Sequence, residues 1–211
     1  MTANELKTTT LLAGAATALP HAQAAEAVGD LIARIKSADD PIRGPAWQGA
    51  GAAGAAAVKP LAALLTDANF EVARSAKRAL YKIIRHADRP GATAEAKAVE
   101  TELVGLLNTS AVPARREALW MLSEIGSDHA IAPMAALLTD TEVREDARCA
   151  LMRFPGAQAT TALKSAFAHA PQEFKHALAE SLRQRGEKVA GYPSQRLVPT
   201  RQTRVGQPQT N

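Results

Sequence analysis

Apolar residues recur along this chain at helical spacing, in five stretches that share one pattern. In the best-formed copy, residues 114–126, apolar positions follow one another at intervals of four, three, one and three, which is the stripe of an amphipathic helix. The copies begin at positions 42, 72, 114, 143 and 174. A second apolar segment precedes each copy, at residues 28–36, 55–65, 94–107, 131–138 and 160–168. The pattern therefore predicts five pairs of helices.

The pairs repeat with a unit of about thirty residues. The segment AALLTD at residues 62–67 returns unchanged at residues 135–140, two units and one insertion of about a dozen residues later. The insertion falls near residues 85–97, where the segment His86–Gly91 predicts a loop. A two-helix unit cannot bury its apolar face alone, but stacked units form one continuous core. We therefore expect an all-α solenoid of about five antiparallel helical hairpins over residues 25–186.

The motif Val-Arg-x-x-Ala-x-x-Ala-Leu-Gly-x-Ile-Gly fits residues 114–126 and 143–156 well, and it fits the first and fifth units poorly. It resembles HEAT repeats, in particular the short HEAT-like repeats of phycobilisome-lyase-like proteins, over about residues 27–186. The resemblance implies that the hairpins stack into a right-handed superhelix, an armadillo-like helical scaffold. It indicates fold and not function, because function depends on the site that a repeat carries.

Charge is unevenly distributed along the 211 residues, whose formal net charge is +4. No acid follows Glu187, while Lys188, Arg196, Arg201 and Arg204 are all basic. Residues 187–211 are therefore expected to form a basic, extended or disordered tail. The remainder is close to neutral, so that net charge alone is a weak argument for nucleic-acid binding.

The first 24 residues allow two interpretations. Residues 8–19 are small and apolar, Pro20 follows, and Ala22-Gln23-Ala24 matches the A-x-A pattern of a signal-peptidase site. The stretch resembles the apolar part of bacterial twin-arginine signal peptides, but the two arginines are missing. The alternative is a frayed N-terminal helix. Export to the periplasm and a cytoplasmic location therefore both stay open, and no run reaches the roughly 18 apolar residues that span a bilayer.

Residues for catalysis or metal binding are not grouped in the sequence. Metal-dependent HEAT-like hydroxylases carry His-Glu pairs, whereas this chain has Arg116-Glu117 at the corresponding place and no H-x-x-x-H spacing. The single cysteine, Cys149, has no histidine within a helical turn. We therefore expect no catalytic residue, no metal and no cofactor. A chromophore-lyase-like enzyme is a third alternative that rests on the family resemblance alone.

The second helix of each unit is expected to line the concave face, where the variable positions of the pattern point outward. Among these, Trp120 stands in a column that is otherwise mostly polar, and mixed charge around one aromatic residue is typical of a protein-binding hot spot. We expect a monomeric, non-catalytic scaffold that binds a protein partner through this face. The expected contact residues are Arg74, Ser75, Arg78, Lys82, Arg116, Glu117, Trp120, Glu124, Asp146 and Arg153.

The main alternative is a nucleic-acid-binding or DNA-glycosylase-like HEAT protein. Arg74, Arg78 and Lys82 form a row at spacing four that could contact phosphates, with Tyr81 and Trp120 available for stacking on bases. Acids in the following units would repel a phosphate backbone. By contrast, the repeated arginine column is expected to be structural, pairing with acids of adjacent units; its members are Arg43, Arg115 and Arg144.

Overall fold

The computed structural model describes residues 21–194, which form helices, turns and loops and contain no strand. The helices are α1 His21–Ile35, α2 Asp40–Gln48, α3 Val58–Ala63, α4 Phe70–Ala87, α5 Thr93–Leu106, α6 Val112–Ile125, α7 Asp128–Ala136, α8 Arg144–Arg153, α9 Ala157–His169 and α10 Gln172–Gln184. Short 3-10 helices lie at η1 Ala50–Ala53, η2 Ala55–Ala57, η3 Leu64–Thr66 and η4 Leu137–Thr139. Most of the signal-like segment and of the tail lies outside the described residues.

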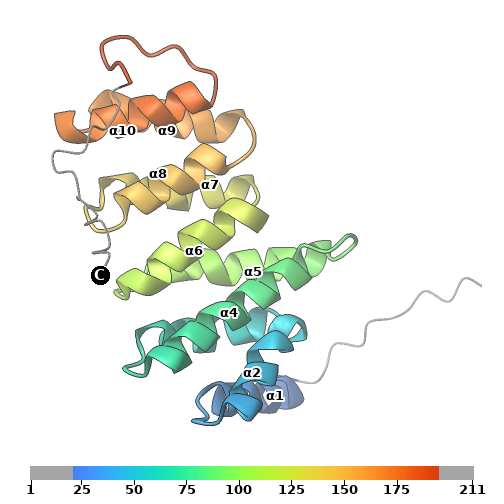
Figure 1. The fold of residues 1–211 in the computed structure, drawn as a ribbon. Helices are drawn as coiled ribbons and strands as arrows, with labels where there is room; N and C mark the ends of the chain where they lie inside the picture. Colours follow the sequence, from blue (N-terminus) through green and yellow to red (C-terminus); the bar gives the residue numbers. More distant parts are fainter. Residues whose placement is uncertain (1–20, 195–211) are drawn as a thin grey trace, which may run out of the picture.

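The helices stack in chain order, from α1 and α2 at one end to α9 and α10 at the other (Figure 1). The odd-numbered helices α1, α3, α5, α7 and α9 each contact the next odd-numbered helix. The even-numbered helices α2, α4, α6, α8 and α10 do the same in a second row. The predicted all-α solenoid of five helical hairpins is thereby confirmed.

The doubled segment AALLTD adopts the same conformation in both copies. In each, an odd-numbered helix, α3 or α7, passes into a 3-10 turn that ends at the threonine. The carboxylate of Asp67 accepts a hydrogen bond from the backbone N–H of Asn69, and that of Asp140 accepts one from Glu142, both at 2.9 Å. These Asx turns end the first helix of the unit and direct the chain into the second.

Small side chains at the centre of the first four units let the helices approach closely. Ala76, Ala118 and Ala147, which share one position of the pattern, are fully buried, and Phe154 and Phe174 fill the core around the last two units. The first unit departs from the pattern. Its first apolar position, Ile42, is 44% exposed, and α2 gives way to the 3-10 helix η1 after Gln48.

The insertion between the second and third units lengthens helices more than it forms a loop. Helix α4 has 18 residues and continues through His86 to Ala87, so the predicted loop at these two residues is wrong. Only residues 88–92 connect α4 to α5, and there Arg89 pairs with Glu95 at 2.5 Å. As a result, α4 presents a much longer face than the 10-residue helix α8.

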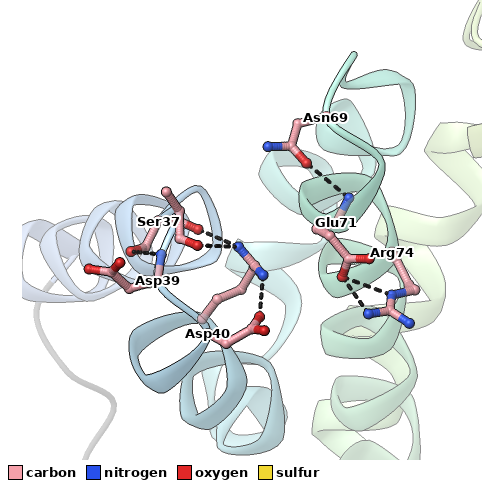
Figure 2. A network of polar contacts seen from close by, with 8 residues as sticks. Ser37, Asp39, Asp40, Asn69, Glu71 and Arg74 are labelled. Carbon is pink, nitrogen blue, oxygen red and sulfur yellow. Dashed lines mark hydrogen bonds and ion pairs between the residues drawn. The ribbon is translucent and has the colours of Figure 1, made fainter.

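The repeated arginine column links neighbouring units, as predicted, at two of its three positions. Arg115 pairs with Asp140 of the following unit, and Arg144 reaches Glu173 of the next at 3.6 Å. Arg43 differs, because it pairs with Asp40 of its own helix and donates to the backbone carbonyl of Ser37 at 2.6 Å. Figure 2 labels these two partners, Asp40 and Ser37. The prediction of an adjacent-unit partner is therefore wrong for Arg43. Asp67, the acid of the second unit that corresponds to Asp140, forms the Asx turn but no ion pair with Arg43 in the described residues.

Candidate protein-interaction surface

The even-numbered helices expose nine of the ten predicted contact residues at least in part. The exception is Ser75, which is 2% exposed, so the prediction that it faces solvent is wrong. Successive residues of a helix point about 100° apart, which turns Ser75 away from the face of Arg74 and into the packed interior. Its counterparts Glu117 and Asp146 are half-buried and bond to the preceding even-numbered helix. This column therefore lies in the seam between helices.

One hollow, of about 330 Å³, lies along α4, and we call it the α4 groove. Its lining residues are Trp47, Arg74, Lys77, Arg78, Tyr81, Lys82 and Arg85. Apart from Trp47 on α2, all come from one face of α4, and Asn69 caps the start of that helix by accepting from the N–H of Glu71 at 3.0 Å (Figure 2). Five of the seven lining side chains are basic, so the groove is a local concentration of positive charge.

Three of the five cations of the α4 groove lie over aromatic rings. The guanidinium carbon of Arg78 is 5.0 Å from the centre of the Trp47 ring, and that of Arg85 is 5.8 Å from the centre of Tyr81. At the start of the helix, Arg74 lies 5.8 Å from the ring of Phe70, which is 72% exposed. Cation–π contacts of this kind hold long side chains in place while leaving their charge available.

The second group of predicted residues gathers around Trp120, and we call it the Trp120 cluster. A hollow of about 200 Å³ is lined by Arg116, Trp120, Glu145, Asp146 and Cys149. The cluster also includes Glu124, which accepts a hydrogen bond from the indole N–H at 2.9 Å, and Arg153, whose guanidinium carbon lies 3.8 Å from the ring centre. Trp120 is 42% exposed, in agreement with the prediction that it projects from the stack.

Glu117 connects the α4 groove with the Trp120 cluster. From α6 it pairs with Lys77 at 2.5 Å and accepts a hydrogen bond from the hydroxyl of Tyr81 at 3.1 Å. Burial, followed by the negative charge of Glu117, raises the pKa of Tyr81 well above its usual value of 10, so this hydroxyl stays a hydrogen-bond donor. The carboxylate therefore marks the border between a basic surface and one of mixed charge.

The sequence-based selection missed several residues of this surface, chiefly Trp47, Lys77, Arg85 and Glu145. The signal for those on α4 was present, because the cations and Tyr81 recur at spacings of three and four from residue 74 to residue 85. Trp47 could not be found in this way, since it lies outside the repeat positions that aligned with Trp120. Its position depends on how α2 packs against α4.

The C-terminal end of the stack carries a further hollow, of about 450 Å³, next to the residues that follow α10. Tyr192 packs edge-on against Phe167 and His176, with ring centres 5.2 and 5.1 Å away. Arg183 donates to the carbonyl of Tyr192 at 2.5 Å and pairs with Glu180 at 2.8 Å. The part of the predicted tail that the structure describes, residues 187–194, thus lies against α9 and α10.

Within residues 21–194, no group of three His, Cys, Asp or Glu side chains is placed so that it could bind a metal ion. Cys149 is half-buried, and its sulfur lies 3.4 Å from a guanidinium nitrogen of Arg148. None of the helices described is long and apolar enough to cross a membrane.

No protein-family model and no curated protein matches this chain. Among solved structures, the chain is similar to an engineered protein from a structural genomics consortium, with 25% identity, a TM-score of 0.37 and coverage of 75% of this chain and 78% of that one. It is also similar to a computationally designed armadillo repeat protein for modular peptide recognition, with 22% identity, a TM-score of 0.40 and coverage of 76% and 82%. A designed armadillo repeat protein in complex with the peptide (KR)4 gives 22%, a TM-score of 0.41 and the same coverage. These TM-scores mark a distant likeness, and the fold assignment stands on the helices themselves.

Proposed function

We propose that this chain is a non-catalytic scaffold of HEAT-like repeats that binds a protein partner along its even-numbered helices, with Trp120 at the centre of the contact. The carrying observation is an indole that is 42% exposed and yet held by Arg153 on one side and Glu124 on another. An exposed aromatic side chain that is already ordered loses little conformational entropy on binding, which is the behaviour of an interface anchor.

The charges around Trp120 support a protein partner. Arg116 pairs with Asp146 at 3.2 Å, and Glu124 and Glu145 are both exposed beside them. A polar rim of mixed sign around an aromatic centre is the usual composition of a protein interface. A phosphate backbone would meet carboxylates there, and it would be repelled.

Nucleic-acid binding is the second candidate, and the α4 groove is the observation that favours it. Its five cations lie on one helix face with two aromatic rings beside them. The acids of α6 and α8 interrupt this positive surface at Glu117, however, so it does not continue across the stack. The protein partner is therefore the better-supported function.

The test is selection from a displayed random-peptide library on the immobilised chain, followed by affinity measurements with the selected peptides. Trp120→Ala should weaken their binding by about tenfold or more. Ile42→Ala, which removes an equally exposed apolar side chain, is the matched control. Equal binding by both variants would contradict the proposal.

Two further measurements bear on the same proposal. Titration with duplex DNA at about 50 and about 200 mM salt should show no tight, salt-dependent binding, since such binding would favour the second candidate. Light scattering during size-exclusion chromatography tests the expectation that the chain is a monomer. The circular dichroism spectrum of Trp120→Ala should match that of the unaltered chain. A loss of helical signal in this variant would instead show that Trp120 is a core residue.

A further inference from the structure

We propose that the α4 groove binds a short acidic peptide segment. This inference rests on the proposed function and names the chemistry of one part of the partner: a stretch of Asp and Glu residues that lies along α4 beside Trp47. The groove is distinct from the Trp120 cluster, because the two share no lining residue.

The first support is a group of cations without acidic partners. Within the α4 groove, Arg74 pairs with Glu71, and Lys77 pairs with Glu117 at 2.5 Å. Arg78, Lys82 and Arg85 take part in none of the thirteen ion pairs of the described part of the chain. Three adjacent positive charges on one helix face repel one another, and carboxylates from a partner would relieve that repulsion.

The second support is the shape and lining of the groove. The Trp47 and Tyr81 rings form apolar walls below the guanidinium groups of Arg78 and Arg85. A peptide can therefore bury its backbone and β-carbons against the rings while its carboxylates meet the cations. Guanidinium groups suit this purpose because they bind carboxylates with two parallel hydrogen bonds.

The third support is length. From Arg74 to Arg85 the basic face extends about 16 Å along the axis of α4, at 1.5 Å per residue. That distance accommodates about five residues of extended chain. A nucleic-acid duplex, with one negative charge about every 1.7 Å, gains affinity from many phosphate contacts over a broad surface. Here Glu117 and the acids beyond it close the basic face on the α6 side.

The chain's own C-terminal residues do not have the chemistry of this occupant. From Lys188 onward the sequence contains four basic residues and no acid, so these residues would be repelled by the cations of the α4 groove. The ligand proposed for the groove is an acidic segment of another molecule.

The probe is a fluorescein-labelled peptide of about ten alternating Glu and Asp residues, titrated by fluorescence anisotropy at about 50 mM salt. The key variant is Arg78→Gln/Lys82→Gln/Arg85→Gln, which removes the three unpaired charges and keeps long polar side chains. Lys97→Gln is the control for loss of a cation outside the groove, because Lys97 is exposed on the odd-numbered helix α5 and forms no ion pair in the described residues. Circular dichroism and a thermal melt check that each variant folds.

Binding of the peptide, weakened about tenfold or more in the triple variant and unchanged in Lys97→Gln, supports the inference. Absence of peptide binding, or equal weakening in both variants, overturns it. So does tighter binding of a single-stranded or duplex oligonucleotide of equal charge that the triple variant abolishes, since the groove would then be a nucleic-acid site.

The two proposals can fail separately. Trp120→Ala should leave binding of the acidic peptide within about twofold, because its side chain does not line the α4 groove. If partner peptides from the library depend on Trp120 while the acidic peptide does not bind, the proposed function stands and this inference is wrong. If the acidic peptide binds as described and Trp120→Ala weakens no partner peptide, the inference about the α4 groove stands and the proposed role of Trp120 is wrong.

Discussion

Arg153 on α8 covers the ring of Trp120 on α6, with its guanidinium carbon 3.8 Å from the ring centre. The two residues come from successive units, so the contact depends on the stacking of the units. On the other side, the indole N–H of Trp120 is engaged by Glu124 of its own helix. The tryptophan is therefore exposed and ordered at the same time.

Replacing Arg153 with Gln should make Trp120 more accessible and lower the free energy of unfolding by about 0.5–1 kcal/mol, the usual worth of an exposed cation–π contact. In a Trp47→Phe background, acrylamide quenching of the remaining tryptophan reports accessibility, and urea unfolding reports stability. Arg78→Gln is the control, since Arg78 lies over Trp47. Unchanged quenching in Arg153→Gln would show that the contact does not persist in solution.

Replacing Arg185 with Gln should lower the free energy of unfolding by about 2–3 kcal/mol. Its guanidinium donates to the carbonyls of Met152, Phe154 and Gly156 at 2.9, 2.5 and 2.5 Å, at the C-terminal end of α8, where carbonyls lack partners within the helix. Urea unfolding measures the loss, with Lys188→Gln as the exposed control. A loss as small as that of the control would mean that water replaces these hydrogen bonds without cost.

The two copies of AALLTD offer a matched pair of substitutions. Both Asp67→Ala and Asp140→Ala remove an Asx turn. Only Asp140→Ala also removes the carboxylate that pairs with Arg115, whose buried Nε has no hydrogen-bond partner among residues 21–194. Asp140→Ala should therefore lower the urea midpoint more than Asp67→Ala does. Equal midpoints would show that the ion pair between the third and fourth units adds nothing to the turn.

The contact between α10 and residues 192–194 should depend on pH. Hydrogen bonds from Arg183, and then from Ser194 and Gln184, lower the pKa of Glu180 from 4.5 to about 2. A carboxyl group whose pKa is lowered by folding contributes its full stability above its ordinary pKa. That contribution is lost as the pH falls through the pKa that the group has in the folded chain.

The Tyr192 ring signals in NMR spectra should therefore shift between about pH 4.5 and about pH 2 as Ser194 and Arg183 lose the charged acceptor. Far-UV circular dichroism on the same samples separates this local release from unfolding of the helices. Glu180→Gln should abolish the transition, and its persistence in that variant would assign it to another group.

The sequence pattern was sufficient to predict the number of hairpins, their order and the role of Arg115 and Arg144. Each of these depends on contacts within a unit or between successive units, where the spacing of apolar residues determines which face is buried. The aspartate that ends both copies of AALLTD, Asp67 and Asp140, was likewise visible in the sequence.

Other features required the three-dimensional structure. Ser75 and Arg74 are consecutive in sequence, and only the packing of helices on both sides of α4 decides that Ser75 is buried. Pro90 in the segment His86–Gly91 led to the prediction of a loop. Helix α4 nevertheless continues to Ala87, because the buried contacts of Ala87 outweigh the turn-forming residues that follow. Trp47 lines the α4 groove because α2 of the first unit packs against α4 of the second. No local sequence pattern predicts this contact.

One wall of the α4 groove is Trp47, which belongs to the terminal hairpin of the described stack. In a linear array, an end hairpin is held by neighbours on one side only and opens at lower free energy than those inside. A ligand that fills the space between Trp47 and α4 binds only while that hairpin is docked, so occupancy and docking are thermodynamically linked. Binding at the proposed site would therefore be coupled to opening of the first described hairpin, and hydrogen exchange in α2 would slow when the groove is filled.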